Sequence, residues 1–87
     1  MKPPNDSIHT IDITAEQVRA ARALVGWSQD ELANRAGVTR RTIAAFESGE
    51  KVPHRSTMCR ILSVFEDSRV SFINSGEVIG VVRKAQA

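Results

Sequence analysis

The sequence has a single cysteine and no long apolar run. Cys59 has no second cysteine to pair with, so a disulfide within the chain is excluded. No segment approaches the roughly 20 consecutive apolar residues that a membrane-spanning helix needs. Residues 1–7 are polar, include two prolines and lack the apolar stretch of a signal peptide. We therefore expect a soluble cytoplasmic protein with no membrane association.

Patterns that carry catalysis or bind metals are also missing from the sequence. His9, His54 and Cys59 do not have the spacing of metal ligands. No serine or carboxylate stands in a recognisable nucleophile motif, and there is no glycine-rich phosphate loop. A chain of 87 residues forms one domain and rarely encloses a substrate cavity. We expect a protein that is not an enzyme, with no catalytic residues, no metal, no cofactor and no small-molecule ligand.

The composition is that of an ordinary globular domain. Hydrophobic residues make up 41% of the chain and charged residues 25%, a balance that supports a packed core. The formal net charge is +2, and the isoelectric point is about 9.2. This excess of positive charge permits nucleic-acid binding without requiring it, so the distribution of the charges has to decide.

Capping and turn signals predict four short helices in the middle of the chain. Ser28 and Glu31 have the spacing of a capping box, and Gly37 ends the helix that they begin. The same kinds of signal bound the other helices. The four expected helices run from Thr14 to Gly26, from Ser28 to Gly37, from Thr39 to about Ser48, and from Ser56 or Thr57 to about Asp67. Trp27 lies between two of them and is expected to anchor the core.

After the fourth helix the pattern changes to that of strands. Residues 70–73 and 77–82 read as a β-hairpin whose turn is formed by residues 74–76. Ile8, Ile11 and Ile13 give a weak extended signal near the start of the chain. The predicted organisation is a tail at 1–13, in part extended, a helical domain at 14–67, and a C-terminal hairpin with a short tail at 68–87. The fold class is mainly α, a bundle of about four helices with a C-terminal β-hairpin.

The third helix has two different faces. Ile43, Phe46 and Glu47 point toward the other helices. The opposite face carries Arg41, Ala44, Ala45 and Ser48, with Arg40 beside them. Such a face can enter a major groove, where arginine pairs with guanine and a small apolar residue touches a thymine methyl. The alternative is that arginine and alanine are simply good helix formers on a solvated surface.

The combined motif resembles the Cro/cI-like helix-turn-helix family, also called the Xre family. The matching residues are Trp27-Ser28-Gln29, Glu31-Leu32-Ala33, Ala36-Gly37-Val38, Thr42-Ile43, Phe46-Glu47-Ser48-Gly49 and Pro53, within a match that covers roughly residues 15 to 66. The resemblance implies a lambda-repressor-like helical domain that usually acts as a homodimeric repressor or regulator on double-stranded DNA. It also implies that Gln29 contacts a phosphate. The candidate DNA-binding residues are Ser28, Gln29, Thr39, Arg40, Arg41, Thr42, Ala45, Lys51 and Arg55.

Two features depart from the family pattern. Members such as lambda repressor continue into a fifth helix that serves for dimerisation, whereas this chain changes to strand pattern after residue 69. Glu50 stands where a basic residue would favour the phosphates, which leaves Lys51, His54 and Arg55 as candidates in the same loop. We therefore expect the hairpin to replace the fifth helix in the dimer, or else to fold back on its own helices.

Two charged residues fall on inward faces. Arg22 lies in the apolar stripe of the first helix, and Glu47 lies beside Ile43 on the third. An unpaired buried charge is very costly, so the two are expected to form an internal ion pair that fixes the third helix; otherwise each reaches water separately. The family has a matching pair.

A second functional class remains open at this stage. Some proteins of this fold act mainly by binding a partner protein, as antitoxins and antiactivators do. The apolar run of residues 78–82 is a candidate for such a binding surface. Salt-dependent binding to bulk duplex DNA separates the two classes, because a domain that binds only a partner protein does not show it.

Overall fold

The computed structural model describes residues 13–85. It contains α1 (Ala15–Val25), α2 (Gln29–Ala36), α3 (Arg40–Glu47), α4 (Arg55–Asp67), β1 (Val70–Asn74) and β2 (Ile79–Arg83). The expected mainly helical fold with a C-terminal hairpin is confirmed. The extended segment expected near the start of the chain lies outside the described residues, apart from Ile13, which is buried.

Local hydrogen bonds set where the first two helices begin. The Thr14 hydroxyl accepts from the Gln17 amide at 3.1 Å, and the Gln17 side chain accepts from the Thr14 amide at 3.0 Å, so a complete capping box starts α1. At α2 the Ser28 hydroxyl accepts from the Glu31 amide as expected. The Glu31 carboxylate instead lies 3.7 Å from Arg35, one turn further along. Of the two capping-box hydrogen bonds predicted at α2, only the one to the serine hydroxyl therefore forms. Both form at the start of α1, where only an N-cap was expected.

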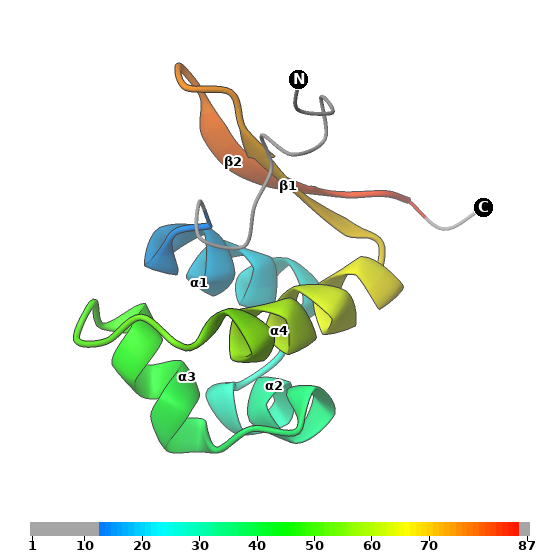
Figure 1. Ribbon diagram of the computed structural model, residues 1–87. Coiled ribbons are helices and arrows are strands. Elements are labelled where there is room, and N and C mark those ends of the chain that lie inside the picture. The colour runs from blue at the N-terminus through cyan, green and yellow to red at the C-terminus, as the bar shows by residue number, and fades with distance from the viewer. Residues whose placement is uncertain (1–12, 86–87) are drawn as a thin grey trace.

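The helices enclose one core. α2 and α3 lie at one end of the molecule, and the hairpin lies across α1 and the end of α4 at the other (Figure 1). The buried hydrophobic residues are Ile13, Val18, Ala21, Leu32, Ala33, Ala36, Ile43, Phe46, Met58, Ile61, Phe65 and Val70. Because all four helices and β1 contribute to this one cluster, the helix pair α2–α3 is held by the whole fold.

Aromatic side chains connect the two ends of the molecule. The Trp27 ring stacks on Phe65 with a centroid distance of 5.5 Å, and Phe65 meets the Phe72 ring edge-on at 5.7 Å. The Arg35 guanidinium lies 4.4 Å from the centre of the Trp27 ring. Trp27 is therefore a core anchor, as expected, and it links the start of α2 to the hairpin through α4.

The hairpin is antiparallel and packs one face on its own helices. Val70 pairs with Arg83 and Phe72 with Val81, and Val70 and Phe72 contact the core. The buried Gln17 side chain donates to the carbonyls of Ile73 and Gly80, at 2.9 Å each. This face of the hairpin thus folds back on the helices of its own chain, which is one of the two arrangements expected. The opposite face leaves apolar side chains exposed.

Two boundaries differ from the prediction. The second strand begins at Ile79 and not at Glu77, because Ser75 closes the turn with hydrogen bonds to both the amide and the carbonyl of Val78. α4 begins at Arg55, before the predicted Ser56 or Thr57, with His54 as an N-cap that makes no side-chain hydrogen bond. No described helix is long and apolar enough to cross a membrane.

Candidate nucleic-acid interface

A short turn sets the orientation of α3. Gly37 ends α2 with φ 71°, in the left-handed region that residues with a side chain rarely adopt. Two residues later, Thr39 begins α3 by accepting a hydrogen bond from the Thr42 amide at 3.1 Å. With so few residues in the connection, α3 cannot fold back along α2 and crosses it, as in other helix-turn-helix units.

The faces of α3 follow the predicted pattern. Ile43, Phe46 and Glu47 are buried. Arg40, Arg41 and Ser48 are exposed, and Ala44 and Ala45 are half-buried between the two faces. The helix therefore presents arginines at its N-terminal end and small side chains along its length, a shape that can approach a flat or grooved partner closely.

The two arginines differ in how they are held. The Arg41 side chain takes part in no ion pair or hydrogen bond within residues 13–85. Arg40 lies 3.7 Å from Asp30, but both side chains are about two-thirds exposed or more, at 66% and 72%. An exposed pair at this distance contributes little to stability, so both guanidinium groups are free to bind another molecule.

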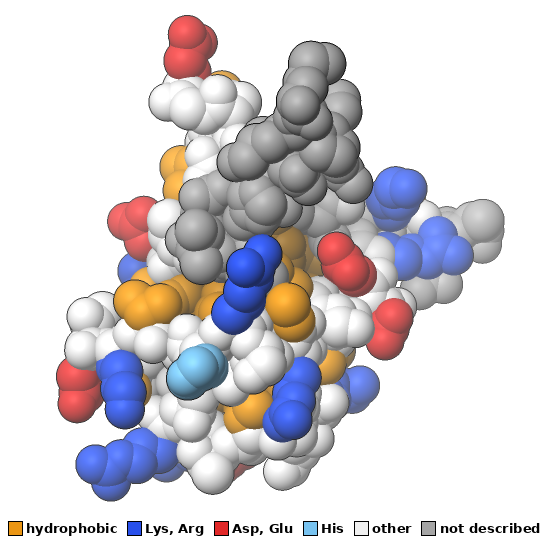
Figure 2. Space-filling view, in the orientation of Figure 1, with side chains coloured by type: hydrophobic (Ala, Val, Ile, Leu, Met, Phe, Trp, Pro, Cys, Tyr) orange, Lys and Arg blue, Asp and Glu red, His pale blue; other side chains and the backbone are white. Residues whose placement is uncertain are grey.

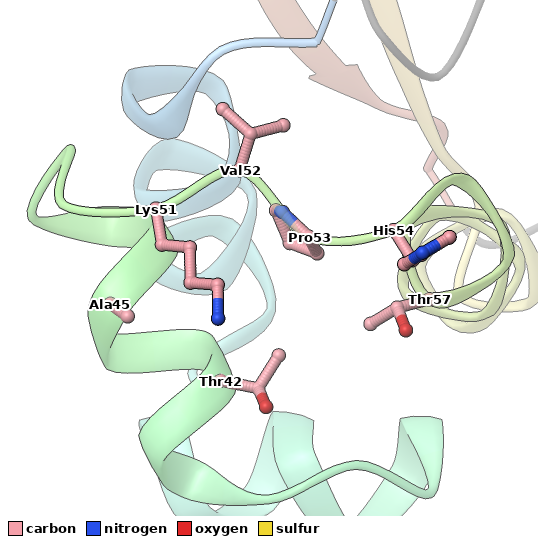
Figure 3. A pocket seen from close by; sticks show the side chains of 7 residues that line it. All are labelled: Thr42, Ala45, Lys51, Val52, Pro53, His54 and Thr57. Carbon is pink, nitrogen blue, oxygen red and sulfur yellow. The ribbon is translucent and has the colours of Figure 1, made fainter.

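Thr42, Ala45 and Lys51 line one pocket of about 280 Å³ between α3 and the start of α4. Figure 3 shows the Lys51 side chain reaching into the space beside Thr42, with His54 and Thr57 across from it. Val52 and Pro53 complete the lining. Sequence reasoning missed Val52 and Thr57; the loop carried no signal for Val52, and Thr57 was read as a possible helix start.

The other predicted site residues lie outside this pocket. Ser28 and Thr39 are exposed, and their hydroxyls cap α2 and α3. The Gln29 side chain, expected at a phosphate, donates inward to Glu47 at 3.1 Å and is half-buried. Arg55 is exposed as the first residue of α4 and does not line the pocket.

Arg22 and Glu47 meet in the interior. The Arg22 guanidinium donates to both carboxylate oxygens of Glu47, at 2.6 and 2.7 Å, and to the Trp27 carbonyl at 2.9 Å. The side chain of Glu47 is 3% exposed and that of Arg22 is 20% exposed. The Arg19 guanidinium donates to the Glu47 carbonyl. These bonds tie the C-terminal end of α3 to α1 and thereby fix how α3 is presented.

The environment of Glu47 favours its charged form. Burial by itself raises the pKa of Glu47, but hydrogen bonds from Arg22 and Gln29 and the charges of Arg22 and Arg19 oppose it, so the pKa lies below its ordinary value. The hydrogen bond with Glu47 raises the pKa of Arg22 against the effect of burial. Both groups stay ionised at neutral pH, which fits a structural pair. Within the described residues, no three His, Cys, Asp or Glu side chains gather where they could hold a metal ion.

Comparison with known proteins gives two findings. The family model described as Helix-turn-helix matches residues 18–68. A protein of Bacillus subtilis (strain 168), named as the uncharacterized HTH-type transcriptional regulator YgzD, is 41% identical over 49 residues, which are 56% of this chain and 74% of that protein. The matched segment contains α2, the turn and α3, and it ends before the hairpin.

Proposed function

The chain belongs to the Xre-type helix-turn-helix family, and from that premise we propose that it is a transcriptional repressor that binds a two-fold-symmetric DNA site as a homodimer. Its relative carries the name of a transcriptional regulator, which supports the regulatory role. A stretch of DNA covered by this protein is closed to other DNA-binding proteins, and this exclusion is a direct route to repression.

The exposed face of α3 is the observation that carries the proposal. Arg41 projects from the N-terminal end of that helix without a partner among the described residues. In a major groove its guanidinium can hold the O6 and N7 atoms of a guanine. Ala45, one turn further along, leaves room for the helix to approach and can contact a thymine methyl. These residues would supply the base readout.

Phosphate contacts would come from the groups beside α3. Lys51 lies in the pocket next to Thr42 and supplies a positive charge that can meet a phosphate. The first amides of α4 receive no side-chain cap from His54, so they can donate to an anion there. Gln29 has one amide hydrogen left after its bond to Glu47 and can still donate to a phosphate. Such contacts position the protein without reading sequence.

The salt dependence of binding to bulk duplex DNA tests this function. Wild-type protein is expected to lose affinity steeply as salt rises, because each neutralised phosphate releases counterions. Lys51→Ala is expected to weaken binding similarly on all sequences and to reduce the logarithmic salt slope by about one. Fluorescence anisotropy on a duplex of about 10 base pairs, which takes one copy, gives both quantities.

Lys84→Ala is the matched control. It removes the same charge from the exposed end of the hairpin, far from α3, and should leave the slope unchanged. A wild-type protein with no salt-dependent duplex binding would contradict the proposal. That result would favour the second candidate function, binding of a partner protein as antitoxins and antiactivators do. The exposed apolar side chains of the hairpin support this candidate.

A further inference from the structure

Exposed apolar side chains are concentrated on the hairpin. Within the described residues, the large hydrophobic side chains that remain exposed are Leu24, Val52, Ile73, Val78, Ile79 and Val82. Val52 lies in the loop beside α3, Leu24 lies at the end of α1, and the other four lie on the hairpin. The strand register puts Ile73 and Val82 on the face of the hairpin that points away from the helices, and we call these two residues together with Val78 in the adjoining turn the hairpin patch. A cluster of this kind on a small domain marks an interaction surface.

The strand register and the contacts of β2 hold the hairpin patch in place. Arg83 of β2 donates to the Leu24 carbonyl at 3.0 Å, which fixes β2 against the end of α1. Ile79 lies on the opposite face of the hairpin, where it lines a shallow pocket with Ala20 of α1, and it is not part of the patch. Ile73 and Val82 are diagonal neighbours on the outer face of the hairpin, given the pairing of Ile73 with Gly80. The patch is therefore a surface supported from behind by the core.

Charges of opposite sign mark the two ends of this surface. Glu77 is exposed in the turn of the hairpin. At its other end Arg69, Arg83 and Lys84 are exposed beside Glu66 and Asp67, so that end keeps a positive excess. In Figure 2 an acidic side chain stands at the tip of the hairpin, and basic side chains gather toward the opposite end with acidic ones beside them. A surface that is apolar in the middle, acidic at one end and has a positive excess at the other is complementary to itself when one copy is turned end to end.

We propose that the hairpin patch binds the hairpin patch of a second copy of this chain, with the two hairpins antiparallel and Glu77 of each copy beside Lys84 of the other. The proposal rests on the proposed function, because a homodimer on a two-fold DNA site needs an isologous interface away from α3. The hairpin lies at the opposite end of the molecule from the α2–α3 pair, so such a contact leaves α3 uncovered (Figure 1). It also takes the place of the fifth helix that this chain lacks among its described elements.

The test of the patch is sedimentation velocity without DNA, over protein concentrations from about 1 to 100 μM, the range of modest interfaces. Wild-type protein is expected to sediment as a dimer. Val82→Glu and Ile73→Glu each place a charge in the apolar interface and should give monomers with an unchanged circular dichroism spectrum. Val52→Glu is the matched control, since it charges an exposed valine outside the patch (72% exposed, against 46% for Val82), and it should remain a dimer.

A charge exchange tests the orientation of the two copies. Glu77→Lys and Lys84→Glu each place like charges together across the interface and should weaken dimerisation about five- to tenfold. The protein carrying both changes should recover the wild-type dimerisation constant. Recovery is not expected from a contact within one copy, because Glu77 and Lys84 lie at opposite ends of the hairpin.

Other outcomes overturn the proposal. A wild-type chain that is monomeric up to 100 μM, as it would be if a different protein covers the patch, contradicts the self-association. A Val52→Glu protein that dissociates like Val82→Glu contradicts the assignment of the surface, and a double charge exchange without recovery contradicts the antiparallel arrangement. None of these results affects the salt-dependent binding of a single copy to DNA, so failure of the dimer and failure of the proposed function are distinguishable.

Discussion

Arg22→Ala is expected to lower the free energy of unfolding by about 3–5 kcal/mol, the cost of leaving a buried charge without its partner. The change leaves the Glu47 carboxylate, which is 3% exposed, with Gln29 as its remaining side-chain donor. Glu47→Ala is expected to cost less, because Arg22 is 20% exposed and keeps its bond to the Trp27 carbonyl. Urea unfolding at pH 7 measures both values.

The effect of Arg22→Ala should depend on pH. The pKa of Glu47 is lowered in the folded protein, so its stabilising contribution is present above the ordinary carboxyl pKa of about 4.3 and is lost as the pH falls through the folded value. The gap between wild-type and Arg22→Ala proteins should therefore narrow below about pH 4. Arg40→Ala is the control, because it removes an arginine from an exposed pair and should cost under about 1 kcal/mol at any pH. Equal stability of Arg22→Ala and Arg40→Ala would show that the internal pair does not hold the fold.

Phe65→Ala is expected to lower the free energy of unfolding by about 3–5 kcal/mol, through lost burial and the cavity left behind. Phe65 is fully buried and touches Trp27 on one side and Phe72 on the other. Because those rings connect α2 to the hairpin, Trp27 fluorescence should change and the hairpin amides should exchange with solvent more quickly. Urea unfolding, fluorescence and hydrogen exchange measure the three effects.

Ser63→Ala provides the matched comparison on the same helix. Ser63 is exposed, and its replacement should change stability by no more than about 0.5 kcal/mol. If Phe65→Ala loses no more stability than Ser63→Ala, or if Trp27 fluorescence is unchanged, the aromatic contact does not connect the two ends of the molecule.

Local signals in the sequence were enough to predict the helices and the faces of α3. Thr14, Ser28 and Thr39 cap helices through bonds to amides three residues away, and such bonds can be read from a short window. The burial of Ile43, Phe46 and Glu47 follows from helical spacing. The meeting of Arg22 with Glu47 could be predicted because two opposite charges on inward faces have to find each other.

Contacts between distant segments could not be predicted in this way. Gln17 anchors the hairpin through carbonyls 56 and 63 residues away, and nothing in its own helix indicates that partner. Val52 and Thr57 join Thr42 in a pocket only because α4 starts beside α3. The strand boundary at Ile79 depends on the bonds of Ser75 within the turn, which apolar alternation does not reveal. The inward bond of Gln29 likewise depends on where Glu47 comes to lie.

Selection of bound fragments from a random pool of duplex DNA tests most directly whether α3 reads sequence. The wild-type chain should enrich one motif, repeated with two-fold symmetry at a centre-to-centre spacing of about 34 Å. Arg41→Ala, selected in parallel, should lose the preference at one base pair of each half-site, at a cost of about 1–3 kcal/mol per contact, while Lys51→Ala keeps the wild-type motif. Arg40 can take the reading role in place of Arg41, so Arg40→Ala is selected as well. The same motif from wild type, Arg41→Ala and Arg40→Ala, or no enriched motif at all, would contradict the account.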